Sequence, residues 1–107
     1  MSLSQVVSAP ITFAASGDNI VIAAVAGKAF RVRKLWLVLT ADSNLTFKDG
    51  ASTSLSGVVS MLGNGSFFFP TDLAVPHFIT TTGNAFIINS SVAVQVSGMV
   101  YYEVTNV

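Results

Sequence analysis

The sequence predicts an all-β fold: an antiparallel two-sheet sandwich of the jelly-roll type with about eight strands. Val, Ile, Thr, Phe and Tyr are abundant, and no segment repeats its apolar residues at helical spacing. Turn residues also interrupt the chain at short intervals, as is typical of sandwiches and barrels. Because no internal repeat, linker or composition break appears, we expect a single domain, 1–107.

The first part of the chain contains three expected strands. They are 4–14, 19–25 and 29–40. Pro10 interrupts the first, because proline cannot donate to a ladder and belongs at an edge or a bend. We therefore expect 1–14 to be an extended arm or an edge strand. The alternation of the third strand changes phase near Lys34, which either a β-bulge or passage from a rim into a packed assembly would produce.

Five further strands follow. They are expected at 44–48, 53–60, 66–69, 85–89 and 92–104. Asp49-Gly50 predicts a hairpin between the first two. In the last, the valine-rich side from Val92 to Val104 is expected in the core, and Gly98 is expected at a bulge. Eight antiparallel strands fit a jelly roll better than an immunoglobulin-like sandwich, whose paired cysteines this chain lacks.

Charged residues are scarce in this chain. They make up 9% of it, five positive and five negative, whereas soluble domains average about a quarter. A net charge near zero promotes association rather than dispersal. We therefore expect much of the surface to be covered, either by copies of the chain in a homodimer or homotrimer or by another protein.

Nucleic acid and membranes are not expected as partners. Lys28, Arg31, Arg33 and Lys34 cluster, but four cations are few for counterion release from nucleic acid. Polar residues interrupt every stretch that could supply the ~20 predominantly apolar residues of a membrane span. The start of the sequence lacks the basic and apolar regions of a secretory signal, so we expect synthesis in the cytoplasm.

The sequence predicts no catalytic residue, cofactor or metal site, and we do not expect an enzyme. His77 is the single histidine and cysteine is absent, too few ligands for zinc. Asp72 lies five residues before His77, but serines are too common here to indicate a triad, and no Gly-x-Ser-x-Gly elbow occurs. Four of the five acids (Asp18, Asp42, Asp49 and Asp72) fall in predicted turns, where aspartate binds nearby backbone.

Large apolar side chains provide the interface candidates. Phe67, Phe68 and Phe69 are consecutive in a strand, so at least one must lie on a second buried surface or in an oligomer contact. Trp36, Met99 and Tyr101 complete the candidates, because strand aromatics are more often core residues or interface anchors than sugar platforms. Stacking of Trp36, Tyr101 or Tyr102 on sugar rings is the alternative.

Several segments resemble small virion proteins of tailed phages. They are Ser16-Gly17-Asp18-Asn19-Ile20-Val21, Ala24-Val25-Ala26-Gly27-Lys28, Phe30-Arg31-Val32, Leu45-Thr46-Phe47-Lys48-Asp49-Gly50, Leu55-Ser56-Gly57 and Val96-Ser97-Gly98-Met99-Val100-Tyr101-Tyr102-Glu103-Val104. Spanning residues 12–104, the similarity is nearest to the jelly-roll capsid decoration, or cement, proteins of bacteriophages.

The resemblance implies a non-catalytic structural virion protein. It would be made in the bacterial host cytoplasm and would stabilise the shell through oligomeric contacts with itself and with the major capsid protein or another virion protein. The alternative is a carbohydrate- or receptor-binding module of a phage tail or fibre.

Overall fold

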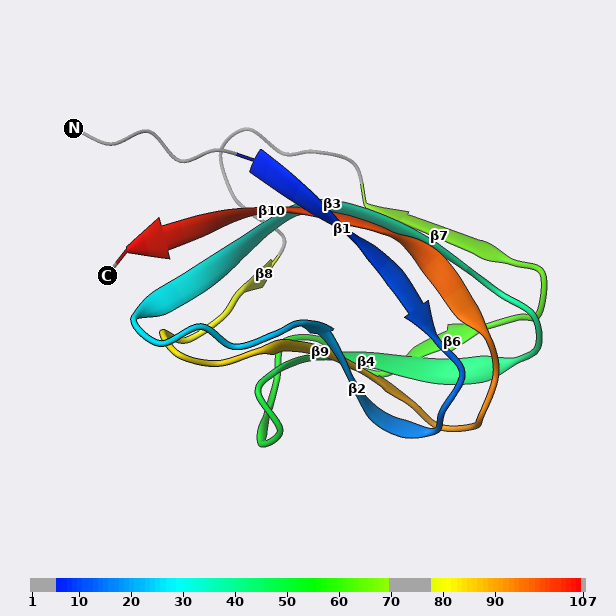
Figure 1. The fold of residues 1–107 in the computed structure, drawn as a ribbon. Helices are drawn as coiled ribbons and strands as arrows, with labels where there is room; N and C mark the ends of the chain where they lie inside the picture. The colour runs from blue at the N-terminus through cyan, green and yellow to red at the C-terminus, as the bar shows by residue number, and fades with distance from the viewer. Residues whose placement is uncertain (1–5, 70–77, 107) are drawn as a thin grey trace.

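The computed structural model describes residues 6–69 and 78–106 and confirms two antiparallel β-sheets packed as a sandwich (Figure 1). Sheet A contains β1 (Val6–Phe13), β10 (Val96–Asn106), β3 (Lys28–Leu39), β7 (Ser66–Phe69) and β8 (Phe78–Ile79). Sheet B contains β2 (Gly17–Ile22), β9 (Phe86–Ser90), β4 (Ser43–Asp49), β5 (Thr53–Ser54) and β6 (Val59–Met61).

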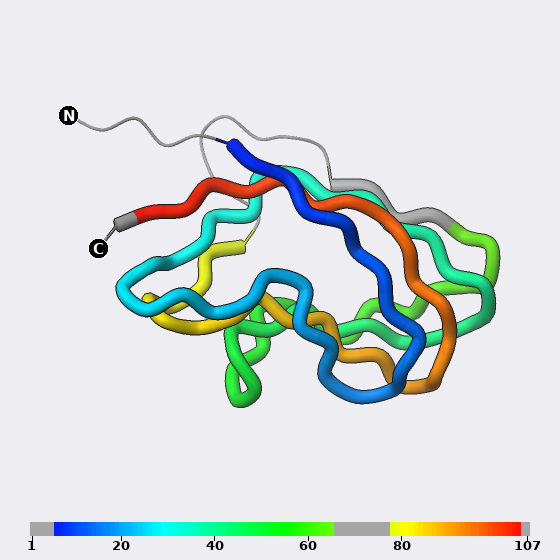
Figure 2. Tube along the Cα trace, in the orientation of Figure 1, coloured from blue at the N-terminus to red at the C-terminus, as the bar shows by residue number. Residues whose placement is uncertain are grey.

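The two halves of the chain pair with each other in reverse order. Strand β1 pairs with β10, β2 with β9, β3 with β7 and β8, and β4 with β5 and β6. From β1 to β4 the chain alternates between the sheets, so a long antiparallel ribbon is rolled into a sandwich (Figure 2). This connectivity gives the jelly-roll order that the sequence predicts.

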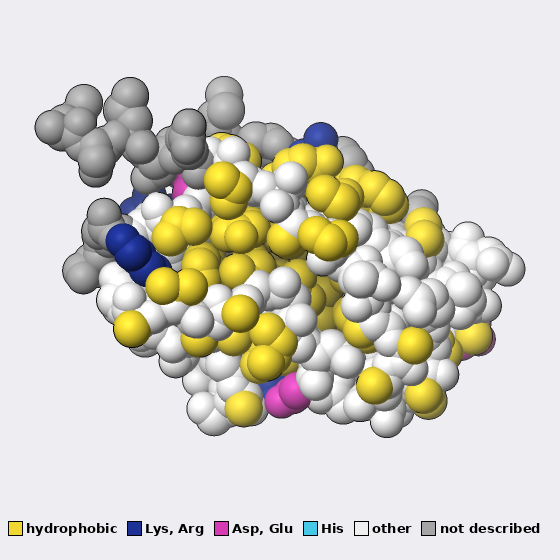
Figure 3. Space-filling model, in the orientation of Figure 1, with side chains coloured by type: hydrophobic (Ala, Val, Ile, Leu, Met, Phe, Trp, Pro, Cys, Tyr) yellow, Lys and Arg dark blue, Asp and Glu magenta, His cyan; other side chains and the backbone are white. Residues whose placement is uncertain are grey.

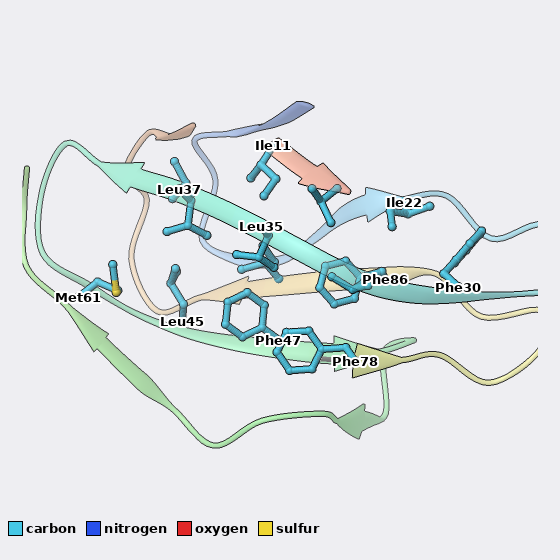
Figure 4. Close-up of a cluster of buried hydrophobic side chains, with 14 of the residues drawn as sticks. Ile11, Ile22, Phe30, Leu35, Leu37, Leu45, Phe47, Met61, Phe78 and Phe86 are labelled. Carbon is cyan, nitrogen blue, oxygen red and sulfur yellow. The ribbon is translucent and has the colours of Figure 1, made fainter. Parts of the chain in front are cut away.

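The core lies between the two sheets (Figure 4). Phe47 of β4 stacks on Phe78 and Phe86, with ring centroids 5.0 and 6.2 Å apart. Val96 and Val100 are fully buried, so these two residues of the valine side lie in the core as predicted. Val92, which lies before β10, is 44% exposed and Val104 is 38% exposed, so the prediction is wrong for both ends of the valine side.

Strand β3 contains a register irregularity close to the predicted position. Tyr101 of β10 lies opposite Lys34, but Tyr102 lies opposite Val32, which leaves Arg33 as the extra residue. The extra residue moves the inward side of β3 from Val32 to Leu35, both fully buried. The phase change in the sequence is therefore a bulge.

The bulge predicted at Gly98 is wrong. Gly98 pairs in continuous register with Ile11 of β1 and Leu37 of β3. A Cβ atom at this position would overlap the carbonyl oxygen of Trp36 and lie 2.8 Å from the Cα of Leu37. Glycine is needed here because the backbone of β3 approaches closely.

Three other elements differ from their expected bounds. Pro10 does not break β1, because β1 is an edge strand and its outer side needs no donor. The expected strand 53–60 is divided into the short strands β5 and β6. Between them the Phe47 amide donates its hydrogen bond to the Ser56 hydroxyl, at 3.1 Å, in place of a backbone carbonyl, which interrupts the ladder with β4. Strand β2 ends at Ile22, so the expected continuation to residue 25 is absent.

Candidate assembly face

The outer face of sheet A brings three of the predicted interface residues together. In the register, Pro10 of β1 lies opposite Met99 of β10, and Met99 lies opposite Trp36 of β3. The flanking residues Ile11 and Leu37 are buried in the core, so these three side chains project outward. We call Pro10, Met99 and Trp36 the apolar row.

Further apolar side chains extend this face on both sides of the apolar row. Trp36 is 38% exposed and Val38, one row away, is 39% exposed. Ile79 and Val6 are more than half exposed, but they lie opposite Arg31 and Glu103, and the row of Lys34 and Tyr101 separates them from the apolar row. The apolar row and Val38 therefore form the adjoining apolar part of this face, of the kind that marks a contact site.

Phe67, Phe68 and Phe69 belong to β7, the neighbour of β3. Their backbones lie opposite Leu37, Trp36 and Leu35 respectively. Phe68 therefore continues the backbone register of the apolar row, whereas the side chains of these three residues lie outside the described part of the structure.

Charged side chains occupy the other end of the outer face and are engaged with neighbours. Arg33 forms an ion pair with Glu103, and both side chains are less than one-fifth exposed. The Lys34 ammonium lies 5.2 Å from the centroid of the Tyr101 ring, a cation–π arrangement. Tyr101, the remaining described candidate, is thus held at the border between the apolar row and the basic end.

Tyr102 does not belong to this face. Its side chain points into the sandwich, where its ring meets the ring of Phe30 edge-on with centroids 5.6 Å apart. Of the three rings considered as sugar platforms, Trp36 and Tyr101 remain on the outer surface.

A second apolar area lies at the open side of the sandwich. Hydrophobic side chains gather there between β1 and the chain around β2, with charged side chains at the margin (Figure 3). In the segments that border this area, Val25 is 48% exposed and Val7 of β1 is 38% exposed. The sequence pattern did not single out this area.

The described aspartates serve structural hydrogen bonds. Asp49 is 5% exposed and accepts bonds from the Thr81 amide at 3.0 Å, the Thr81 hydroxyl at 2.7 Å and the Asn84 side chain at 3.1 Å. Burial raises the pKa of Asp49, but these bonds outweigh burial and hold it below the ordinary value. Asp42 accepts a bond from the Gly63 amide at 2.6 Å.

Asp18 joins β2 to its neighbour β9 and to β4, the next strand of sheet B. It accepts a hydrogen bond from Asn89 at 2.7 Å and pairs with Lys48 at 3.0 Å, and these two partners lower its pKa. Asp72 and His77, the other residues weighed for catalysis, lie outside the described residues.

One described cavity is rich in hydroxyl groups. It has a volume of about 270 Å³ and is lined by Asp42, Ser43, Asn44, Ser60, Met61, Leu62 and Ser91. The Ser43 hydroxyl bonds to that of Ser90 at 2.7 Å, which ties β4 to β9.

Within residues 6–69 and 78–106, no three His, Cys, Asp or Glu side chains group closely enough to hold a metal ion. The same residues include no helix of the length and apolarity that crossing a membrane requires.

Comparison with known proteins identifies the fold rather than a family. No protein-family model matches the chain, and no curated protein does. A solved structure from Bacillus endospore appendages, described as a novel family of disulfide-linked pili, is similar with a TM-score of 0.51 and 11% sequence identity. The match covers 99% of this chain and 92% of the other. At that identity, the likeness is one of fold.

Proposed function

We propose that this chain is a non-catalytic structural protein that assembles with copies of itself through the outer face of sheet A. The apolar row is the observation that carries this proposal, because it places Trp36 in the middle of a sheet face with apolar neighbours on either side. The described aspartates and Glu103 support a structural role, since each binds a backbone, side-chain or cationic partner that holds the fold together.

For its place of action we propose the virion of a tailed phage, as a capsid decoration protein. The resemblance over residues 12–104 supports this placement, with the major capsid protein or another virion protein as the partner beyond itself. Such a protein would add many weak contacts around a shell, where repetition multiplies affinity.

A pilus-like filament is a second candidate for the assembly, because the fold likeness is to a pilus protein. The related structure is described as disulfide-linked, whereas this sequence contains no cysteine. A filament of this chain would therefore be held by non-covalent contacts, and it would dissociate in denaturant without a reducing agent.

Light scattering of the purified chain over a concentration series tests self-assembly. We expect the mass to rise above that of the 11.2 kDa chain as concentration increases.

Trp36→Ser should weaken association about 30-fold, the effect of losing a hot spot of about 2 kcal/mol. Ile20→Ser is the matched control, since Ile20 is exposed but lies opposite Ile87 of β9, on the outer side of sheet B. A wild-type chain that stays monomeric throughout would overturn the proposal. Loss of association by Ile20→Ser instead would move the contact to the outer side of sheet B.

Carbohydrate binding is a further candidate, favoured by the outward position of Trp36 and Tyr101. A sugar stacking on Trp36 would shift its fluorescence, and Trp36 is the single tryptophan of the chain. A glycan array without signal, together with unchanged fluorescence on adding the sugars of the proposed host surface, would remove this candidate.

A further inference from the structure

The free edges of both sheets are poorly suited to adding a strand from another molecule. On the free edge of β1, Pro10 lacks the amide hydrogen that a new strand would need. On β2 the register skips Val21 between Ile20 and Ile22, an irregularity that disturbs the edge. The opposite edge of each sheet is made of two short strands in place of one long one. Strands β7 and β8 both pair with β3, and β5 and β6 both pair with β4. Association through a sheet face is therefore favoured over association through an edge.

The outer face of sheet A is large enough for a stable contact. From Ser97 to Thr105 it extends roughly 30 Å along β10, and four strands give it a width of roughly 19 Å. Two such faces in contact would together bury roughly 1,100 Å². This total exceeds the ~1,000 Å² expected of a biological interface.

The distribution of charge selects one way of stacking two such faces. Four of the five cationic residues (Lys28, Arg31, Arg33 and Lys34, with Lys48 the fifth) lie in the first seven residues of β3. Glu103 pairs with Arg33 at this end, which leaves the end with a net positive charge. If strands ran parallel across the interface, these ends would meet, with Arg31 about 11 Å from its counterpart. If strands ran antiparallel, that separation would be about 28 Å, well beyond the screening length of about 8 Å.

We infer that the outer face of sheet A is covered by the same face of a second copy, with the strands antiparallel across the interface. The two-fold axis runs along the apolar row, so Met99, Trp36 and Pro10 each lie opposite their own counterpart. An apolar row is complementary to itself, which a two-fold interface requires. The inference rests on the proposed function, because it specifies the partner and the geometry of the proposed assembly.

Cysteine crosslinking tests this geometry without background, because the natural sequence has no cysteine. Facing sheets lie about 10 Å apart, too far for a disulfide, so a short bis-maleimide is the reagent. Met99→Cys and Pro10→Cys each place two thiols across the axis. Thr105→Cys lies about 20 Å from the apolar row, so its thiols meet in the parallel arrangement and lie far apart in the antiparallel one. Thr46→Cys, on the outer side of sheet B, reports random collision.

At about 10 µM protein, crosslinking of Met99→Cys and Pro10→Cys should exceed that of Thr46→Cys by roughly 100-fold, as expected for thiols held at millimolar effective concentration. Thr105→Cys should match the Thr46→Cys control. Efficient crosslinking at Thr105→Cys would overturn the antiparallel arrangement. If the protein associates in light scattering but neither Met99→Cys nor Pro10→Cys crosslinks, the inferred two-fold geometry is wrong. The proposed function is then retained only if Trp36→Ser still weakens association. If it does not associate at all, both fail.

Discussion

Asp49 should be the carboxylate whose replacement most destabilises the described fold. Its three hydrogen bonds join the end of β4 to the turn before β9, and the carboxylate is nearly inaccessible to solvent. Hydrogen bonds to a charged group contribute about 1.5–3 kcal/mol net. Because Thr81 is exposed and can bond to water when the carboxylate is lost, we expect Asp49→Asn to lower the free energy of unfolding by about 2–3 kcal/mol.

Urea unfolding followed by the fluorescence of Trp36, at low protein concentration, measures this loss. Asp42→Asn is the matched control, since Asp42 accepts a single described bond, from Gly63, at an exposed site. It should cost less than about 1 kcal/mol. A loss for Asp49→Asn no larger than that of the control would refute the reasoning.

The pH dependence of the same measurement provides an independent check. The folded pKa of Asp49 lies below its ordinary value of 3.8, so its contribution to stability is complete well above that pH. It is lost as the pH falls from about 3.8 through the folded pKa. Asp49→Asn should remove this part of the acid destabilisation, and a variant with the wild-type pH profile would contradict the assignment.

The remaining predictions concern packing and surface charge. Gly98→Ala should lower the free energy of unfolding in urea by about 2–3 kcal/mol, because its Cβ would overlap the backbone of β3. Gly57→Ala, with open space around it, should be nearly neutral. Equal effects of the two variants would show that the close approach is relieved without cost. Phe47→Ala should cost about 3–5 kcal/mol by the same assay, and a loss below 1 kcal/mol would mean that the aromatic stack repacks. Lys48→Ala breaks the partly exposed ion pair with Asp18 and should cost less than about 1 kcal/mol, a difference that should shrink as salt is added; a larger, salt-insensitive loss would contradict a screened pair.

The alternation of apolar and polar residues within single strands predicted several features of the fold. The phase change near Lys34 indicates either a bulge or passage into a packed assembly, and the register shows the bulge, in which an extra residue reverses the inward side of the strand. The alternation around Val96 and Val100 correctly placed both in the core. Strand β7 has the bounds expected from the sequence, 66–69, since Pro70 follows it directly.

Long-range contacts account for what the sequence could not reveal. Strand β8 is two residues long, and it is a strand because Phe78 and Ile79 pair with β3, more than 40 positions earlier. The apolar row depends on the register that sets Met99 opposite Trp36, and no pattern within either strand encodes that pairing. Gly98 was read as a bulge because glycine in a strand indicates either a bulge or a close approach of backbones, and the second applies here.

The solvent exposure of Trp36 as a function of protein concentration tests the central claim most directly. Trp36 is the single tryptophan, and in the isolated chain its side chain is 38% exposed on the outer face of sheet A. If copies cover that face, its emission should shift to the blue and its quenching by iodide should fall as concentration rises, in step with the mass from light scattering. Emission and quenching that stay constant while the mass increases would show that the chain assembles through another surface.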